Sequence, residues 1–189
     1  MVSKIGESME LKFDDLLTAA FFAAQKHRVQ TRKDTQQTPY INHPLEVAKT
    51  LAVDGGVTDV DLLMAAMLHD TVEDTETSME ELAEHFGTRV AALVAEVTDD
   101  KSLTKGERKR LQVDQAPKKS DAAKQLKIAD KICNARDIIQ RSPAGWNNER
   151  KRRYLEWANN VVVGCQGVNA KLDVLVKKVI QDGLNELSE

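Results

Sequence analysis

The sequence predicts an all-α protein, a compact bundle of several helices that forms a single domain. Two observations support this prediction. Apolar residues recur at the three- and four-residue spacing of a helix face through most of the chain, and no segment alternates convincingly in the two-residue period of a half-buried strand. The chain has 189 residues, of which 41% are hydrophobic and 30% charged, enough for one sizeable core, and no internal repeat divides it.

The first elements can be placed from composition and periodicity. Residues 1–12 are polar and predict a flexible N-terminal tail, so the folded domain is expected to span residues 13–189. An amphipathic helix over Phe13–Arg28 should pack its apolar stripe inward. The basic stretch 27–38 has no periodicity and predicts an exposed loop, a common place for ligand-binding side chains.

A second helix is expected to begin at Pro44, because proline suits the first helical position, where its missing N–H is no loss. This start places His43 at or beside the N-cap, and the Gly55–Gly56 pair should end the helix. Capping patterns, a Ser or Thr followed three residues later by an acid, mark several later helix starts. These patterns are Thr58 with Asp61, Ser78 with Glu81 and Thr104 with Glu107, and the last helices are predicted at about Lys105–Gln115, Asp121–Gln140, Asn148–Cys165 and Asn169–Leu184.

One stretch, Leu62–Thr75, joins an apolar run to four chemically active side chains. Its sequence is LLMAAMLHDTVEDT, and in a continuous helix Glu73 would lie over His69 and Asp74 over Asp70, since residues four apart share a face. A buried helix would then end at a polar site. The alternative is a core helix whose charged last turn simply meets water. The choice depends on whether other segments supply complementary ligands.

Two other predicted helices supply such ligands. His43 stands at the start of one, and Asp130 begins a polar stripe on the other that continues at Asn134. With His69 and Asp70 they form a quartet drawn from three helices, which is how helix bundles build metal sites. Two neutral imidazoles and two carboxylates neutralise a divalent cation. This donor set without thiolate favours Mn²⁺, Fe²⁺ or Zn²⁺, and Mn²⁺ suits the carboxylates.

Charge is distributed unevenly, although the formal net charge is only −3. Residues 73–100 hold nine acidic side chains and one basic, a net of −8, whereas residues 101–119 hold seven basic and two acidic, a net of +5. A cation site beside a polyanion site explains this layout, with Lys101, Lys105 and Arg108 as candidates to offset phosphate charge. Two solvated helix faces are the alternative. A nucleic-acid surface would normally make the whole domain basic, so no nucleic-acid partner is expected.

The remaining features indicate a cytoplasmic protein. Cys133 and Cys165 lie in helical segments without zinc-like spacing and are expected to be reduced thiols. The N-terminus lacks the apolar region of a secretory signal, and no stretch approaches the ~18 apolar residues that cross a bilayer. No membrane partner is therefore expected, and the oligomeric state stays open.

Several motifs in order along the chain resemble a known family. The quartet matches the ligand pattern of the HD-domain metal-dependent phosphohydrolases. The surrounding motifs are similar to those of the small stand-alone RelA/SpoT-type alarmone hydrolases, in particular the metazoan SpoT homologues. The likeness covers nearly the whole chain, from Leu16 to Val179. The motifs are RKD at Arg32–Asp34, TPYINHP at Thr38–Pro44, MLHDTVEDT at Met67–Thr75, and EVTDDK with ERKRLQ within Glu96–Gln112.

This resemblance implies an HD-domain bundle that uses Mn²⁺ to remove the 3′-pyrophosphate from guanosine tetra- or pentaphosphate (ppGpp or pppGpp), giving GDP or GTP. It implies that Glu73 and Asp74 are the catalytic carboxylates, and the sequence does not tell which takes a proton. The run IADKICNARD departs from the leucine-rich form usual in the family, so the purine pocket is expected to differ in detail. The resemblance makes His43, His69, Asp70 and Asp130 the metal ligands, and Arg32, Lys33, Asn134 and Tyr154 nucleotide-binding residues.

Four other functions stay open at this stage. Animal relatives are similar to NADPH phosphatases, which remove the 2′-phosphate to give NADH, and a small nucleotide pocket suits either reaction. A non-catalytic HD-fold sensor would bind nucleotide without turnover, although Glu73 and Asp74 are both present. An HD-type nucleotidase would differ only in its substrate. A nucleic-acid-binding module would use the basic residues 101–119 but leaves the quartet unexplained.

Overall fold

The computed structural model describes residues 3–188, with side chains from Phe13 onward, and over this range it confirms the all-α prediction. No strand forms in the described chain, where β pairing is limited to two isolated bridges. The α-helices are α1 (Ser3–Lys26), α2 (Asn42–Lys49), α3 (Val60–Leu68), α4 (Thr71–Asp74), α5 (Met79–Phe86), α6 (Thr88–Val97), α7 (Lys105–Gln115), α8 (Asp121–Gln140), α9 (Asn148–Val163) and α10 (Ala170–Glu186), with a π-helical segment at Thr50–Asp54 and a 3₁₀ turn at Ala116–Lys118.

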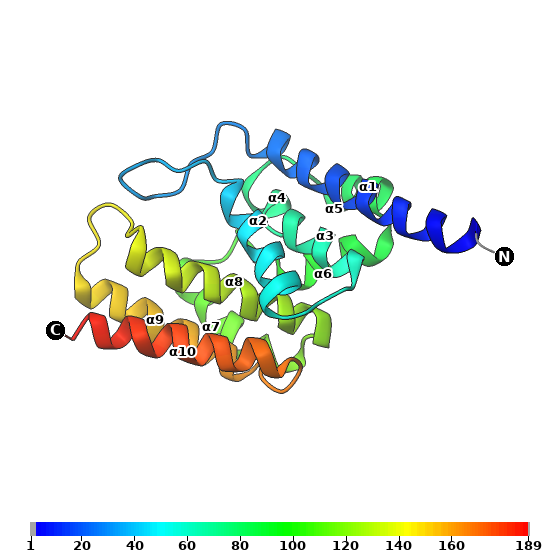
Figure 1. Cartoon of the computed structure of the whole chain (residues 1–189). Coiled ribbons are helices and arrows are strands. Elements are labelled where there is room, and N and C mark those ends of the chain that lie inside the picture. Colours follow the sequence, from blue (N-terminus) through cyan, green and yellow to red (C-terminus); the bar gives the residue numbers. More distant parts are fainter. Residues whose placement is uncertain (1–2, 189) are drawn as a thin grey trace.

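Helix α8 is the central element of the bundle (Figure 1). It contacts α2, α3, α6, α9 and α10, so several helices bury a face against it. Helix α3 is a second hub, in contact with α1, α2 and α6. Because both helices are buried, polar side chains on them lie where water is largely excluded and must find partners inside the protein. The largest fully buried side chains of these two helices are Leu62, Leu68, Leu126, Ile128 and Ile132.

The first helix begins earlier than the sequence predicted. Helix α1 starts at Ser3 rather than at Phe13. No proline interrupts the preceding residues, and several of them, such as Glu, Met, Leu and Lys, are good helix formers. The flexible tail predicted for residues 1–12 includes Met1 and Val2, which lie outside the described residues. The division into a tail and a domain over residues 13–189 therefore stays a prediction.

The prediction of one continuous helix over Leu62–Thr75 is wrong. Helix α3 ends at Leu68, a turn follows, and the short helix α4 begins at Thr71. The hydroxyl of Thr71 donates to the carbonyl oxygen of Leu68 at 2.6 Å, an acceptor that a continuing helix would offer to the N–H of Val72. His69 and Asp70 consequently occupy the junction between two helices.

Two predicted helix starts are displaced by a residue or two. Helix α2 begins at Asn42 rather than at Pro44, so His43 lies in its first turn and is buried. Helix α3 is capped by Asp59, not Thr58, because the Asp59 carboxylate accepts the N–H of Leu62 at 3.3 Å. The pattern at Ser78 does cap α5, and the pattern at Thr104 with Glu107 forms a complete capping box at α7.

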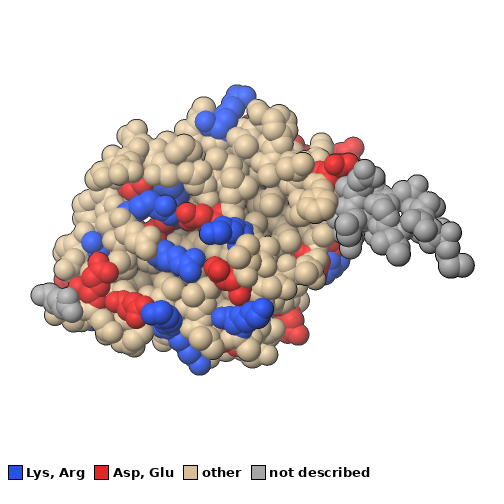
Figure 2. Space-filling model, in the orientation of Figure 1, with Lys and Arg blue, Asp and Glu red and all other residues tan. Residues whose placement is uncertain are grey.

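The contrast between acidic and basic segments does not produce a uniformly basic face. Figure 2 shows Lys and Arg side chains intermixed with Asp and Glu on the visible surface. Contacts between the two segments explain part of this mixing, since Lys101 lies 2.8 Å from Asp74 and Arg108 lies 3.6 Å from Glu73. The two segments therefore meet in space.

Two further expectations concern the cysteines and the membrane. Cys133 and Cys165 are both buried free thiols, as predicted. Over the described part of the chain, no helix combines the length and apolar character needed to cross a bilayer.

The cap of α3 gives a first testable prediction. Asp59→Ala removes the carboxylate that accepts the N–H of Leu62 and also pairs with Arg89, so it should lower the free energy of unfolding by about 1–2 kcal/mol. Thr58→Ala, at the position that the sequence pattern favoured, should change it by less than ~0.5 kcal/mol. Asp59→Asn keeps an acceptor without the charge and should lie between them. Urea unfolding followed by circular dichroism measures all three, and equal losses at the two positions would contradict the assigned cap.

Candidate metal and nucleotide site

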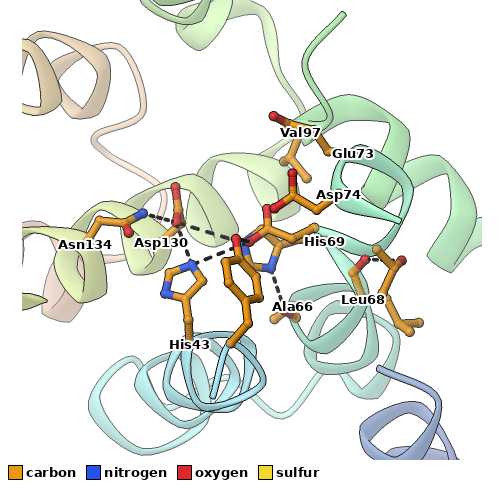
Figure 3. Close-up of polar contacts among 12 residues, drawn as sticks. His43, Ala66, Leu68, His69, Glu73, Asp74, Val97, Asp130 and Asn134 are labelled. Carbon is orange, nitrogen blue, oxygen red and sulfur yellow. Dashed lines mark hydrogen bonds and ion pairs between the residues drawn. The ribbon is translucent and has the colours of Figure 1, made fainter. Parts of the chain in front are cut away.

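Four side chains from three parts of the chain converge in one pocket, and Figure 3 labels three of them, His43, His69 and Asp130. His43 comes from the first turn of α2, His69 and Asp70 from the junction of α3 and α4, and Asp130 from the middle of α8. The Nε2 atom of His43 lies 3.3 Å from Oδ1 of Asp130 and 3.7 Å from Oδ2 of Asp70. The Nε2 atom of His69 lies 3.2 Å from the same Asp70 oxygen and 3.9 Å from the same Asp130 oxygen. Ligand atoms of His43, His69 and Asp130 all lie within 4.8 Å of one another, and Asp70 lies near both histidines. The four side chains are here called the quartet.

The orientation of His69 fits a metal cation. Its Nδ1 lies 2.8 Å from the carbonyl oxygen of Ala66, a hydrogen bond that requires the proton on Nδ1. In the neutral ring Nε2 then carries the lone pair, and this buried atom makes no hydrogen bond within the described chain. A ring fixed by a backbone carbonyl through its other nitrogen is the usual arrangement of a metal-ligating histidine.

The quartet concentrates negative charge in a buried space. Burial favours neutral His69, but Asp70 and Asp130 outweigh burial and raise the pKa of His69 to about 9. Burial also opposes ionisation of both carboxyls. Even so, His69 lowers the pKa of Asp70, and Lys131 holds the pKa of Asp130 well below its usual range. A pocket that draws a proton onto a buried imidazole also attracts a divalent cation, whose charge the two carboxylates balance.

Further hydrogen bonds orient the two carboxylates. The hydroxyl of Tyr40 donates to Oδ2 of Asp70 at 2.6 Å. Asp130 accepts from Lys131 Nζ at 2.8 Å and from Asn134 Nδ2 at 2.5 Å, one bond to each oxygen. Because every partner is itself anchored on α8 or next to α2, the carboxylates have little freedom to turn away from the imidazoles.

The adjacent carboxylates Glu73 and Asp74 have different surroundings. Glu73 lines the quartet's cavity, which measures about 160 Å³. Burial, followed by the negative charge of Asp99, raises the pKa of Glu73. Asp74 does not line that cavity and instead accepts hydrogen bonds from Gln30 at 3.0 Å and Lys101 at 2.8 Å. The two carboxylates look equivalent in the sequence, but Glu73 lines the small cavity and Asp74 lies outside it.

A larger cavity of about 530 Å³ adjoins the small one. The two share part of their lining, so they meet rather than form separate sites. Positive side chains and aromatic rings line the larger cavity, a combination that suits phosphate groups and a planar base. The shared residues are Arg32, Tyr40, Asp99, Gln112 and Asn134, the other cations are Lys33, Lys105, Arg108 and Lys109, and the other aromatic residues are Trp146, Tyr154 and Trp157.

Arg32 connects the loop after α1 to α8. Its guanidinium donates to Oδ1 of Asn134 at 2.8 Å and to Oδ2 of Asp137 at 2.7 Å. The next residue, Lys33, has an exposed side chain at the cavity wall, and its carbonyl accepts the N–H of Ala144 at 2.8 Å. Two loops that are distant in sequence are therefore joined where they enclose the cavity.

The predicted nucleotide-binding residues all line the larger cavity except Lys101, which contacts Asp74 instead. Sequence reasoning missed several residues around the two cavities, among them Tyr40, Trp146 and Lys127. Tyr40 lies inside the TPYINHP motif, whereas Trp146 lies in a loop that has no periodic signal. Lys127 precedes Asp130 by three residues and so shares its side of α8, a spacing that would have pointed to it.

The fold and the quartet define a class of protein. The HD domain family model matches residues 19–156, a range that contains the whole quartet, and the chain belongs to this family. The chain is 54% identical over 166 residues to guanosine-3′,5′-bis(diphosphate) 3′-pyrophosphohydrolase MESH1 of Homo sapiens, covering 88% of this chain and 93% of that protein. The Mus musculus protein of the same name is 53% identical over 167 residues, with the same coverage.

A solved structure is also closely similar. It is described as a metazoan orthologue of SpoT that hydrolyses ppGpp and plays a role in starvation responses. It shares 48% sequence identity and a TM-score of 0.87 with this chain, and the match covers 90% of this chain and 96% of the other. The relationship that the sequence motifs indicated is thereby confirmed.

The geometry of the quartet predicts that a divalent cation stabilises the fold. Mn²⁺ at about a hundred times its dissociation constant should add roughly 2.7 kcal/mol to the free energy of unfolding. His69→Ala and Asp130→Asn should remove most of this gain, because the first deletes a predicted ligand and the second removes the negative charge of another. We prefer Asn to Ala at 130, since Ala would also leave the buried ammonium of Lys131 without its partner.

Thermal unfolding with and without Mn²⁺ measures the effect without reference to any reaction. His85→Ala, an exposed histidine on α5, is the matched control and should keep the full stabilisation. An unchanged Mn²⁺ effect in His69→Ala would show that the cation binds elsewhere.

Proposed function

We propose that the protein is a Mn²⁺-dependent hydrolase that removes the 3′-pyrophosphate from ppGpp or pppGpp, giving GDP or GTP and pyrophosphate. The junction of the two cavities carries this proposal, because a nucleotide in the larger cavity would present a phosphate group to the quartet in the smaller one. The names of the relatives, which are 3′-pyrophosphohydrolases acting on guanosine-3′,5′-bis(diphosphate), support the same reaction.

In this proposal His43, His69, Asp70 and Asp130 hold the ion. When bound, the cation supplies positive charge that polarises a phosphoryl oxygen and makes water a better nucleophile. The oxygen and nitrogen donors, without a thiolate, favour Mn²⁺ over a structural zinc. The orientation of the His69 ring by the Ala66 carbonyl and the oriented carboxylates prepare the pocket for the ion before substrate arrives.

Glu73 is the residue that we assign as the general base. Water adds to the phosphorus atom attached to O3′, its proton passes to Glu73, and the P–O3′ bond breaks as O3′ takes up a proton from solvent. Glu73 suits this role because it lines the quartet's cavity and because its raised pKa makes it a stronger base. Asp74, held by Lys101 and Gln30, is a positioning residue at the rim.

The larger cavity would hold the rest of the nucleotide. Arg32, Lys33 and Lys105 offset phosphate charge, and Arg32 is already oriented by its bonds to α8. The rings of Trp146 and Tyr154 offer faces on which a base can stack. Lys101 contributes indirectly through Asp74, a role different from the phosphate contact that the charge pattern predicted.

The reaction can be tested directly on the purified protein. With Mn²⁺ we expect ppGpp to yield GDP and pyrophosphate, separated by anion exchange, and no product after exhaustive chelation until Mn²⁺ is restored. NADPH is the second arm of the experiment, and turnover of NADPH to NADH alone would assign the site to a 2′-phosphatase. Binding of both nucleotides with no product from either would instead indicate a sensor.

Steady-state kinetics should separate catalysis from binding. Glu73→Gln keeps the shape of the side chain, and we expect it to lower kcat by roughly 10²–10⁴-fold with little change in KM, the range of a general base. Asp74→Asn should lower kcat by less than about tenfold, since its carboxylate lies outside the small cavity. A larger effect at Asp74 than at Glu73 would reverse the assignment of the base.

Lys33→Ala provides the matching test of substrate binding. Its exposed ammonium contributes the same attraction to substrate and transition state, so its loss should raise KM and leave kcat nearly unchanged. The effect should shrink at high salt, because exposed charges are screened over ~8–10 Å. A fall in kcat as severe as that of Glu73→Gln would give Lys33 a part in the chemical step.

A further inference from the structure

A buried lysine beside the quartet has no role in the reaction described so far. Lys127 lies on α8 and is 6% exposed. Its Nζ donates one hydrogen bond, 2.9 Å long, to the carbonyl oxygen of Val97 at the end of α6, and it forms no ion pair within the described chain. An ammonium has three N–H groups, so two of them have no partner within the described chain.

Lys127 faces the small cavity. It lines the same 160 Å³ space as the quartet and Glu73. The charged groups that act on it are Lys131 and Lys119, which disfavour its charge, and Asp130 and Asp99, which favour it. With burial as the largest influence, they lower its pKa to about 8.

The other lysine and arginine side chains nearest the quartet each contact a carboxylate of the protein. Lys131 pairs with Asp130 at 2.8 Å, and Arg32 is bound by Asn134 and Asp137. Arg108 lies 3.6 Å from Glu73. Among the described lysine and arginine side chains that line this cavity, Lys127 is therefore the one without an ion pair to a protein carboxylate.

We propose that Lys127 is a catalytic residue whose ammonium contacts the diphosphate group at the quartet and donates hydrogen bonds to its phosphoryl oxygens. The proposal rests on the proposed function, because a diphosphate supplies the anion that Lys127 lacks. Hydrolysis places additional negative charge on the phosphoryl group and on the departing oxygen. A preorganised ammonium on a buried side chain stabilises such charge more strongly than an exposed one.

A purely structural role is the competing explanation. Lys127 bonds to a carbonyl at the C-terminal end of α6, where cations are generally favourable. Lys119 provides a control, since its Nζ donates to the neighbouring carbonyl of Glu96 at the same helix end. Lys119 does not line the cavity of the quartet. The two lysines therefore share the helix-end contact and differ in access to the proposed anion site.

The test compares Lys127→Met with Lys119→Met. Methionine has nearly the length of lysine and removes the charge, so Lys127→Met should fold with a thermal midpoint equal to or above that of the unmodified protein, because an unpaired buried charge is lost. We expect kcat for ppGpp with Mn²⁺ to fall by roughly 10²–10³-fold. We expect the affinity for inorganic pyrophosphate with Mn²⁺, measured by calorimetry, to fall by at least about tenfold. Lys119→Met should keep both the activity and the pyrophosphate affinity.

The outcomes separate this proposal from the proposed function. Lys127→Met with a lowered thermal midpoint and full kcat would reduce Lys127 to a helix cap and overturn the proposal. Failure of both Lys127→Met and Lys127→Gln to fold would also overturn the proposal. If the unmodified protein hydrolyses neither nucleotide, the proposed function fails. The pyrophosphate measurement still tests whether Lys127 contacts the anion. Equal pyrophosphate affinity in the unmodified protein and Lys127→Met would then overturn the contact.

Discussion

The close burial of opposite charges is the constraint on which this structure depends. Two imidazoles and two carboxylates lie inside the bundle with nitrogen–oxygen distances of 3.2–3.9 Å between them, although burial opposes charge on His69 and Asp70. Each of these side chains faces a partner of opposite charge or a hydrogen-bond donor, and this contact offsets the cost of burying it. This balance requires α2, the junction of α3 and α4, and α8 to keep fixed relative positions. The aliphatic packing around α3 and α8 holds these positions.

The sequence predicted the helices well where their apolar periodicity was strong. It predicted the ends of the helices less well. Helix α8 and the capping box of α7 agree with the prediction within a residue. The cap at Asp59, the start of α2 at Asn42 and the break after Leu68 do not. Side-chain hydrogen bonds of Asp59 and Thr71 accompany two of these ends, whereas α2 begins without a side-chain cap, and the periodicity of apolar residues contains no information about either case.

The candidate site was predictable to the extent that it follows residue type and spacing. The quartet could be assembled from the sequence because histidines and aspartates on separate helices form a chemically complete set. The difference between Glu73 and Asp74 could not, since neighbouring residues in a short helix point in different directions and meet different cavities. The sequence did not indicate Lys127 as a site residue, because a lysine in a helix is usually solvated. This lysine is buried where α6 packs on α8.

The hydrolytic centre and the wall of the nucleotide cavity belong to different kinds of structure. The quartet is carried by buried helices, whereas much of the wall is formed by two loops joined through Lys33 and Ala144 and by the bridge between Asp34 and Pro143. Loops accept sequence change more readily than packed helices. Descendants of such a protein can therefore acquire a preference for a different base or sugar through these loops alone, and inherit the bond-breaking apparatus unchanged.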